Sequence, residues 1–333
     1  MDLSIIIPYH DETAEKIEPL MNSINWQIGV NFSNIEIILC NDLEDSDGNI
    51  RYEDLEKYKN IFKSIKMIKS IYKNNTGMSR QFAIDTCRGK YVFFCDAADS
   101  LYNRGVLREL LDNISFSHAD MYQFKFMEEI GNKDFPAEKY VYNTKNYNWV
   151  WVFAKAYRVE FLRENGIRFV PENRWHEDTY FNYLCKYCAP KLININSIGY
   201  LWGFNADSIT RVNNHEYTFG SLDDYFKSVT LAFRKILQEY QKDCYVDILH
   251  NILYYYYVFN EPTSKQSDKY EWNEKIYYNF VKEFIPQIFS GYNQEIEQAL
   301  LARNAEFKFN IFPEKTPKQY FAYLNEKYGE EKR

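Results

Sequence analysis

The sequence has no long hydrophobic run and contains little glycine or proline. Its 333 residues include 12 Gly and 9 Pro, and no stretch approaches the roughly 18–20 uncharged apolar residues that a membrane-spanning helix needs. The amino-terminus lacks the basic region and the small-residue cleavage site of a signal peptide. These absences predict a soluble protein that works in the cytoplasm.

An excess of basic residues is also missing. Lys and Arg number 40 against 47 Asp and Glu, which gives a net charge of −7. Proteins that bind nucleic acid in general carry a basic excess, because neutralised phosphates supply most of their affinity. The charge balance therefore disfavours general nucleic-acid binding, although it leaves a local basic groove open. The 46% of hydrophobic and 26% of charged residues are typical of an ordinary globular protein.

Cysteine pairs at the spacing of a zinc ribbon are absent. Cys185 and Cys188 form a C-x-x-C, but no second pair accompanies them. We expect the six cysteines to be thiols in a reducing compartment. Aromatic residues are abundant instead, with 30 Tyr, 25 Phe and 6 Trp. They can fill a core, and they also suit sugar rings, so composition alone does not decide their role.

The order of apolar runs predicts an α/β fold. Nearly continuous β-branched or apolar runs indicate strands that are buried on both faces; these are residues 3–8, 35–40, 65–72 and 91–95. Helical spacing separates them at residues 15–26 and 79–87. This alternation indicates a doubly wound sheet, which binds ligands beyond the carboxyl ends of its strands.

The chain after the fourth strand divides into two parts. We expect a strand at 119–126, helices at 149–162 and 177–187, and an extended segment at 192–202. From about Asn213 the pattern changes to amphipathic helices, at 222–240, 245–259, 272–289, 294–303 and 317–328. The sequence therefore predicts a catalytic α/β domain at 1–212 and an α-helical domain at 213–333.

Acidic residues follow three of the predicted strands, where each strand ends. Asp11 comes after the first strand, Asp42 after the second, and Asp96 and Asp99 after the fourth. Acids gathered at one edge of a sheet make a pocket that needs a metal ion or a hydrogen-bonding ligand. The alternative is that each acid only caps the helix that follows it.

Six segments in order resemble the family-2 glycosyltransferases of the GT-A fold. The resemblance spans about Leu3 to Arg211, and the six segments together are far more specific than any one of them. They are residues 4–10 (SIIIPYH), 36–42 (EIILCND), 75–80 (NTGMSR), 88–99 (RGKYVFFCDAAD), 176–181 (HEDTYF) and 208–211 (SITR). In the first segment His10 stands where the family usually has Asn.

The resemblance implies an enzyme that moves a sugar from a nucleotide donor, commonly a UDP-sugar, to an acceptor hydroxyl with inversion. The sugar would be a hexose or an N-acetylhexosamine, and the acceptor a glycan, a cell-envelope polymer, a lipid-linked precursor or a protein. The chemistry asks for a carboxylate base and for positive charge on the leaving diphosphate. A divalent cation, Mn²⁺ or Mg²⁺, is the usual source of that charge.

The resemblance also implies roles for individual residues. Asp178 matches the acid that acts as base, held ionised by the dipole of the helix that it begins, and Glu177 would orient the acceptor or the neighbouring backbone. The residues expected to bind the nucleotide sugar are Pro8, Tyr9, Asp11, Asp42, Arg80, Asp96, Ser208 and Arg211.

The expected metal ligands are Asp96 and Asp99. The family's D-x-D motif has its second acid at the position of Ala98, which offers no ligand. Either Asp99 restores a metal site, which we favour, or metal binding is weak and Arg80 or Arg211 carries more of the diphosphate charge.

Two other functions remain open at this point. The altered acidic motif is compatible with a non-catalytic scaffold that binds nucleotide sugars, and a transferase acting on modified DNA bases is a third possibility that the net charge of −7 disfavours. The helical domain would bind the acceptor or a second subunit. Within it, the run from Tyr254 to Tyr257 covers all faces of a helix, which favours a buried helix over an aromatic platform for a glycan.

Overall fold

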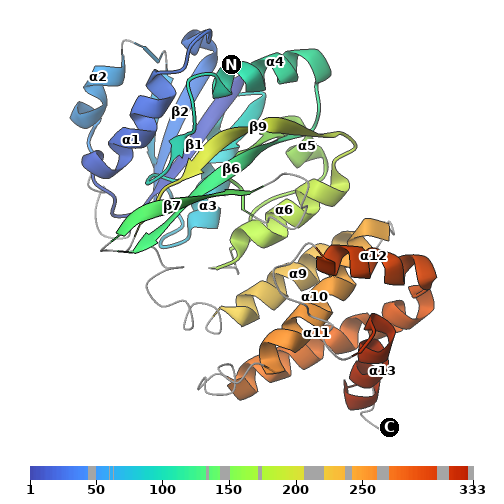
Figure 1. The fold of residues 1–333 in the computed structure, drawn as a ribbon. Helices are drawn as coiled ribbons and strands as arrows, with labels where there is room; N and C mark the ends of the chain where they lie inside the picture. Colours follow the sequence, from blue (N-terminus) through green and yellow to red (C-terminus); the bar gives the residue numbers. More distant parts are fainter. Residues whose placement is uncertain are drawn as a thin grey trace. The chain divides into compact units, whose positions relative to one another are not determined.

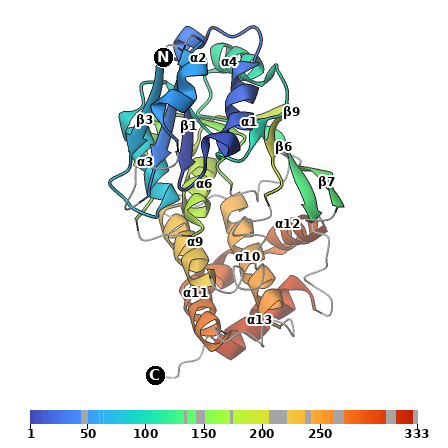
Figure 2. The same cartoon turned by 90° about the vertical axis from the view of Figure 1, so that its left-hand side faces the viewer.

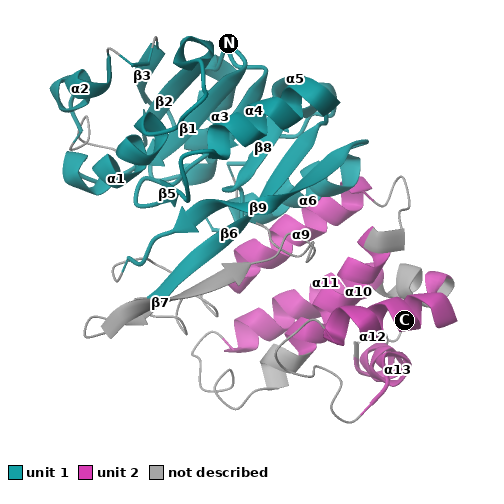
Figure 3. Cartoon of the chain, turned by 45° about the horizontal axis from the view of Figure 1, so that its top comes forward, with its two compact units in different colours: residues 1–212 teal, residues 213–333 magenta. Residues whose placement is uncertain are grey.

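The computed structural model describes two compact units, Met1–Val212 and Asn213–Arg333 (Figure 3). The described residues are 1–43, 50–59, 61–62, 64–132, 135–142, 151–171, 175–205, 221–236, 242–260, 270–305 and 315–328.

A mixed sheet forms the centre of the first unit (Figure 1). Its strands are β1 (Leu3–Tyr9), β2 (Ile35–Asn41), β3 (Ser64–Lys69), β4 (Tyr91–Phe94), β5 (Ser100–Leu101), β6 (Met121–Asn132), β7 (Phe135–Tyr142), β8 (Lys155–Arg158) and β9 (Leu192–Trp202). The order is β3-β2-β1-β4-β8-β6-β9-β5, and β7 pairs with β6. Strands β1 to β4 are parallel, whereas β8 runs antiparallel to both β4 and β6.

Helices cover both faces of the sheet. They are α1 (Ala14–Asn25), α2 (Glu56–Lys59), α3 (Thr76–Thr86), α4 (Val106–Ser117), α5 (Val159–Glu164) and α6 (Glu177–Cys188). Helices α1 and α3 lie on opposite faces of β1 (Figures 1 and 2). The strand core is therefore covered on both sides, which explains why β1 and β2 are buried along their whole length and mostly apolar.

Alternate residues of the central strands enter two different cores. Phe93 of β4 and Ala156 of β8 belong to the core that contains the apolar side of α1. Phe94 instead contacts Tyr157 of β8 and Phe181 of α6, with ring centroids 5.7 and 6.1 Å apart. This alternation follows from the two-residue period of a strand, and it assigns Tyr157 to the face that packs against α6.

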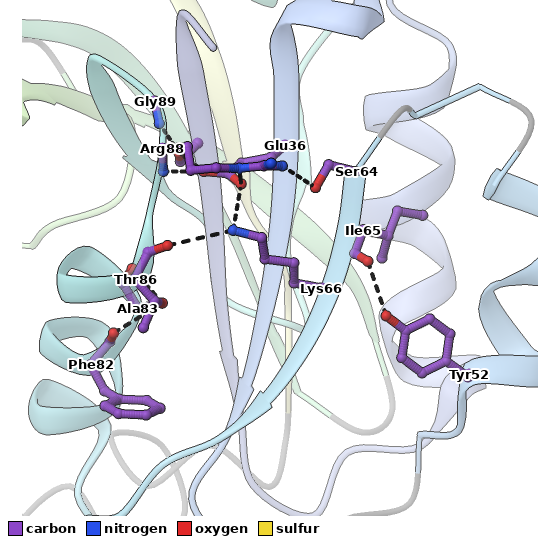
Figure 4. A network of polar contacts seen from close by, with 11 residues as sticks. Glu36, Tyr52, Ser64, Ile65, Lys66, Phe82, Ala83, Thr86, Arg88 and Gly89 are labelled. Carbon is purple, nitrogen blue, oxygen red and sulfur yellow. Dashed lines mark hydrogen bonds and ion pairs between the residues drawn. The ribbon is translucent and has the colours of Figure 1, made fainter.

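A buried carboxylate ties strands β1, β2 and β3 to the start of β4 (Figure 4). Glu36 accepts hydrogen bonds from the hydroxyl of Ser4 at 2.7 Å and from the backbone and side chain of Arg88, and it pairs with Lys66 at 2.9 Å. Burial opposes the ionisation of Glu36, but these donors outweigh it and lower its pKa to about 2. Gly89 is required here because a Cβ would lie 2.4 Å from the Ser4 hydroxyl.

The second unit is a bundle of helices α9 (Leu222–Ile236), α10 (Lys242–Asn260), α11 (Tyr270–Gly291), α12 (Gln294–Ala305) and α13 (Pro317–Tyr328). Its core is rich in aromatic rings, with Phe226 of α9 packed against Tyr255, Tyr277 and Phe280. Tyr255 is therefore a core residue of this unit. No helix in the described part of the chain is long and apolar enough to cross a membrane.

The predicted fold class, a GT-A-like α/β unit followed by helices, is confirmed. The helix predicted at 149–162 is wrong, because its described part contains strand β8 and only then the short helix α5. The third strand ends at Lys69 and does not reach Tyr72. Helix α4 and strand β7 were not predicted.

Candidate active site

The carboxyl ends of β1 and β2 bring three predicted nucleotide-binding residues together. Tyr9 and Asn41 are paired in the sheet, and Asp42 follows directly. Pro8, Tyr9 and Asp42 are buried, whereas Asp11 is exposed beyond the strand end. The ends of the first two strands thus form one wall of the site, with Asp11 at its rim.

His10 contacts Asp42 in this wall. Its Nδ1 atom lies 2.7 Å from Oδ1 of Asp42, and it is the donor when Asp42 is ionised. The His10 side chain is 47% exposed and that of Asp42 only 5%. The amide of Asn41 donates to the carbonyl of His10 at 2.9 Å, which fixes the turn. His10 therefore orients Asp42 and leaves Oδ2 of that carboxylate for another donor.

Arg80 joins three elements at the same edge of the sheet. From α3, its Nη1 donates to Oε1 of Glu177 on α6 at 2.7 Å, and its Nη2 donates to Oδ1 of Asp96 after β4 at 2.8 Å. The residue is 5% exposed. Burial alone would lower the pKa of Arg80, but Asp96 and Glu177 outweigh it and raise that pKa. Glu177, which we expected to orient the acceptor or the backbone, is the partner of this guanidinium.

Gly77 permits the contact between α3 and α6. A Cβ on Gly77 would lie 2.6 Å from Cγ and 2.8 Å from Cβ of Glu177, so a larger residue would displace the partner of Arg80. Asn75 caps α3, because its side chain accepts from the backbone N–H of Met78 at 3.0 Å. The N-x-G segment therefore positions the first turn of α3 against Glu177.

Asp178 lies in the first turn of α6 and is half-buried. Burial raises the pKa of its carboxyl to about 8; Glu177 and Asp96 add to the shift, and Arg80 and Lys155 oppose it. We expected Asp178 to be held ionised, whereas its pKa is raised, with burial as the largest cause. The result is a carboxyl group that titrates close to neutral pH, as suits a general base.

Lys155 is a residue of this site that the sequence analysis missed. It lies in β8, is 3% exposed, and donates from Nζ to the carbonyl of Trp151. Burial lowers its pKa to about 7, against the opposing effect of Asp178. The signal in the sequence was a single lysine between Ala154 and Ala156 in an otherwise apolar run, since lysine is almost never fully buried without a partner.

Tyr200 of β9 fixes the acidic turn after β4. Its hydroxyl accepts from the backbone N–H of Asp96 at 2.9 Å and donates to Oδ2 of Asp99 at 2.7 Å. The backbone N–H of Gly203 donates to Oδ1 of Asp99 at 2.9 Å. Asp99 is buried, whereas the side chain of Asp96 is 38% exposed. The turn thus presents Asp96 to solvent and holds Asp99 behind it.

These two acids fit a cation that is shared with a substrate. Within the described residues no group of three or more His, Cys, Asp or Glu could hold a metal ion by itself. Mg²⁺ is usually bound by one or two carboxylates together with substrate phosphates, not by an all-protein cage. Asp96, which is partly exposed, suits that arrangement directly, and Asp99, both of whose carboxylate oxygens accept hydrogen bonds, lies behind it. The predicted residues Ser208 and Arg211 lie outside the described part of the chain.

Comparisons with known proteins agree with this architecture. S. aureus TarS shares 17% identity with the chain, with a TM-score of 0.65 over 98% of this chain and 54% of TarS, so this chain spans about half the length of TarS. TarS 1–349 in complex with UDP-GlcNAc shares 18% identity, with a TM-score of 0.65 over 100% of this chain and 93% of that one.

A third structure is the mannosyltransferase PcManGT from Pyrobaculum calidifontis in complex with GDP-Man and Mn²⁺. It shares 14% identity, with a TM-score of 0.51 over 97% of this chain and 84% of that one. At these identities the likeness establishes the fold. No curated protein sequence matches the chain. The family model of glycosyl transferase family 2 matches residues 4–175, more than half of the chain. The chain is therefore a glycosyltransferase and belongs to glycosyl transferase family 2.

Proposed function

We propose that this enzyme transfers a hexose or an N-acetylhexosamine from a UDP-sugar to a hydroxyl of a glycan or cell-envelope polymer, with inversion and with Asp178 as the base. The observation that carries the proposal is the position of Asp178, in the first turn of α6 beside the Arg80 ion pairs at the carboxyl edge of the sheet. The complexes of TarS with UDP and with UDP-GlcNAc favour a uridine nucleotide as the donor.

The chemistry is a single displacement at the anomeric carbon. The acceptor oxygen forms a bond to that carbon as its proton passes to the Asp178 carboxylate. The bond to the diphosphate breaks on the opposite face, and the nucleotide leaves with the electron pair. A base whose pKa lies near the working pH is the most effective one, and burial brings the pKa of Asp178 into that range.

Donor binding is assigned to the wall formed by the first two strands. Oδ2 of Asp42 accepts the imide N–H of the base, while Oδ1 is held by His10. Pro8 and Tyr9 line the same wall, and Asp11 contacts the ribose from its rim. Arg80 is occupied by Glu177 and Asp96, so we assign it to building the site and not to binding the diphosphate.

A divalent cation, Mn²⁺ or Mg²⁺, would be held by Asp96 and Asp99. When bound, it would neutralise the charge that develops on the leaving diphosphate. Ser208 and Arg211 are proposed to contact the same diphosphate. We assign the helical unit, Asn213–Arg333, to binding the acceptor or a second subunit.

The test compares Asp178→Asn with Asp112→Asn, a change of the same kind at an exposed position of α4. UDP release from UDP-GlcNAc is measured with water and with glycan acceptors, and UDP binding by calorimetry. Asp178→Asn should lower the rate about 10²–10⁴-fold with UDP affinity unchanged, and Asp112→Asn should change neither. If Asp178→Asn keeps more than about a tenth of the rate, Asp178 is not the base. If the wild-type chain binds UDP and releases none from any UDP-sugar, the chain is a nucleotide-sugar-binding scaffold.

A further inference from the structure

A lysine is buried in the middle of the catalytic unit. Lys155 is 3% exposed, and its neighbours in the chain, Ala154 and Ala156, are buried as well. Burying an ammonium group is costly unless it is paired and hydrogen-bonded. The carbonyl of Trp151 accepts one hydrogen bond from Nζ, but a neutral acceptor does not balance the charge. An anion near Lys155 would therefore lower the cost of burying its ammonium group.

The register of β8 against α6 identifies that anion. Lys155 and Tyr157 lie on the same face of β8, because side chains alternate along a strand. The hydroxyl of Tyr157 donates to Oδ1 of Asn182 on α6 at 2.6 Å. Asp178 lies four residues before Asn182 and so on the same side of that helix. Lys155 is the residue before Tyr157 on this face of β8, and Asp178 is one helical turn before Asn182 on α6. The Tyr157–Asn182 contact therefore places Lys155 and Asp178 next in line on the two elements.

Lys155 and Asp178 both lie at the same edge of the sheet. Strand β8 runs antiparallel to β4, so its first residue, Lys155, lies beside the end of β4 that continues to Asp96. The start of α6 lies there too, because Arg80 contacts both Asp96 and Glu177. Lys155 and Asp178 are each among the electrostatic partners of the other.

The other charged groups around Asp178, Lys155 apart, carry a net negative charge. Glu177 faces it from its own helix, Asp96 from the end of β4 and Arg80 from α3. Arg80 carries one positive charge and pairs with two carboxylates, Glu177 and Asp96. Besides Asp178, the ionisable groups that face Lys155 include Cys185 of α6, a thiol whose pKa is raised by burial. Lys155 is thus a second cation, beside Arg80, among the described groups that face Asp178.

We propose that Lys155 is a positioning residue of the transfer reaction, whose buried amino group pairs with the Asp178 carboxyl and aims it at the acceptor hydroxyl. This inference rests on the proposed role of Asp178 as base. It adds a second residue to the catalytic apparatus, one that acts through Asp178 and does not touch the reacting atoms.

The expected consequence is a change in the pH dependence of the rate. Lys155→Met keeps the length of the side chain and removes its charge. Without the ammonium group the pKa of Asp178 rises, by about one unit or more for the loss of a close opposite charge. The acid limb of the pH–rate profile then moves to higher pH by the same amount. Below the limb the rate falls about tenfold per unit, while the plateau at high pH is retained.

The experiment measures UDP release from UDP-GlcNAc between about pH 5.5 and about pH 9.5 for the wild type and three variants. Lys155→Met should shift the acid limb upward. Lys155→Arg keeps a positive charge and should restore the wild-type limb, even if its plateau is lower. Lys90→Met, at an exposed lysine beside Asp2, should have the wild-type profile. UDP affinity, measured by calorimetry, should be the same in all four proteins.

A stability cycle gives a readout that does not depend on activity. Lys155→Met leaves the Asp178 carboxyl without its buried partner, so the change in urea midpoint caused by Asp178→Asn should differ between the Lys155→Met background and the wild type. The two changes should therefore be coupled, as contacting residues are. Additive changes in the midpoint would overturn the proposal, even if Lys155→Met is too unstable for kinetics.

The outcomes separate this inference from the proposed function. If Asp178→Asn is inactive and the profile of Lys155→Met superimposes on that of the wild type, Lys155 is only a packing residue and this inference is wrong. If Asp178→Asn stays active, the proposed base is wrong, and the role of Lys155 falls with it. A shifted limb in Lys155→Met together with an inactive Asp178→Asn supports both.

Discussion

Lowering the pH below about 4.5 should destabilise the catalytic unit through one residue, Glu36. Its pKa is lowered from the usual 4.5 to about 2 in the folded protein. The unfolded chain therefore binds a proton in a range where the folded protein does not. Stability from this group is complete above about pH 4.5 and is lost as the pH falls toward about 2.

The size of the effect follows from the shift. A pKa difference of about 2.5 units corresponds to about 3 kcal/mol, since each unit is worth 1.36 kcal/mol. The conversion applies without a discount for solvent because the Glu36 side chain is fully buried. Such a contribution is a large fraction of the roughly 5–15 kcal/mol that stabilises an ordinary protein.

The assay compares the wild type with Glu36→Gln in urea between neutral pH and about pH 2. The variant lacks the charge at every pH, so the difference in free energy of unfolding between the two proteins should be greatest at neutral pH. That difference should narrow by about 3 kcal/mol as the wild-type Glu36 becomes protonated. Because all other acids titrate in both proteins, the comparison isolates Glu36. Glu53→Gln, at an exposed glutamate of the same unit, is the matched control. Its free energy of unfolding should differ from that of the wild type by an amount that does not change with pH.

A difference between wild type and Glu36→Gln that stays constant over the whole range would refute the reasoning. It would mean that the hydrogen bonds from Ser4, Arg88 and Lys66 (Figure 4) do not favour the charged form of Glu36. A difference that widens toward low pH would reverse the sign of the argument and contradict it more directly.

Two further predictions concern the donor. Asp42→Ala should weaken UDP binding about tenfold or more, because it removes a charged hydrogen-bond acceptor; His10→Asn should weaken it less, and calorimetry that finds Asp42→Ala unchanged removes Asp42 from the site. EDTA should abolish UDP release and Mn²⁺ or Mg²⁺ should restore it, with Asp96→Asn and Asp99→Asn requiring more cation. Asp112→Asn, at an exposed position of α4, is the control, and full activity in EDTA contradicts metal dependence.

The strands that carry the acidic residues were predictable because they are buried on both faces. Strand β1 is apolar from Leu3 to Pro8 except for Ser4, and such a run differs clearly from the helix that follows it. The same property caused the error at 149–162. Strand β8 and the residues before it are also covered on both faces, and a continuous apolar run has no period that distinguishes a strand from a buried helix.

The contacts within the site were not predictable from spacing along the chain. Arg80 and Glu177 are 97 residues apart in sequence, and their contact depends on how α3 and α6 pack on the sheet. The sequence placed Asp178 at the start of a helix, and the structure agrees. It could not reveal that burial raises the pKa of that carboxyl, because burial is a property of the packed tertiary structure.

The charges of the described site residues explain why the donor needs further positive charge. Arg80 contributes one positive charge against the three carboxylates of Glu177, Asp96 and Asp178 when Asp178 is ionised, and Lys155, whose pKa burial lowers to about 7, contributes at most one more. A nucleotide diphosphate adds negative charge to this balance. Both cations are buried and occupied by protein acceptors, so neither can move to the phosphates without giving up those contacts. The negative charge on the leaving diphosphate must therefore be neutralised by groups other than Arg80 and Lys155. For that reason we expect a divalent cation to have a larger effect on the rate than any substitution of Arg80 that preserves the fold.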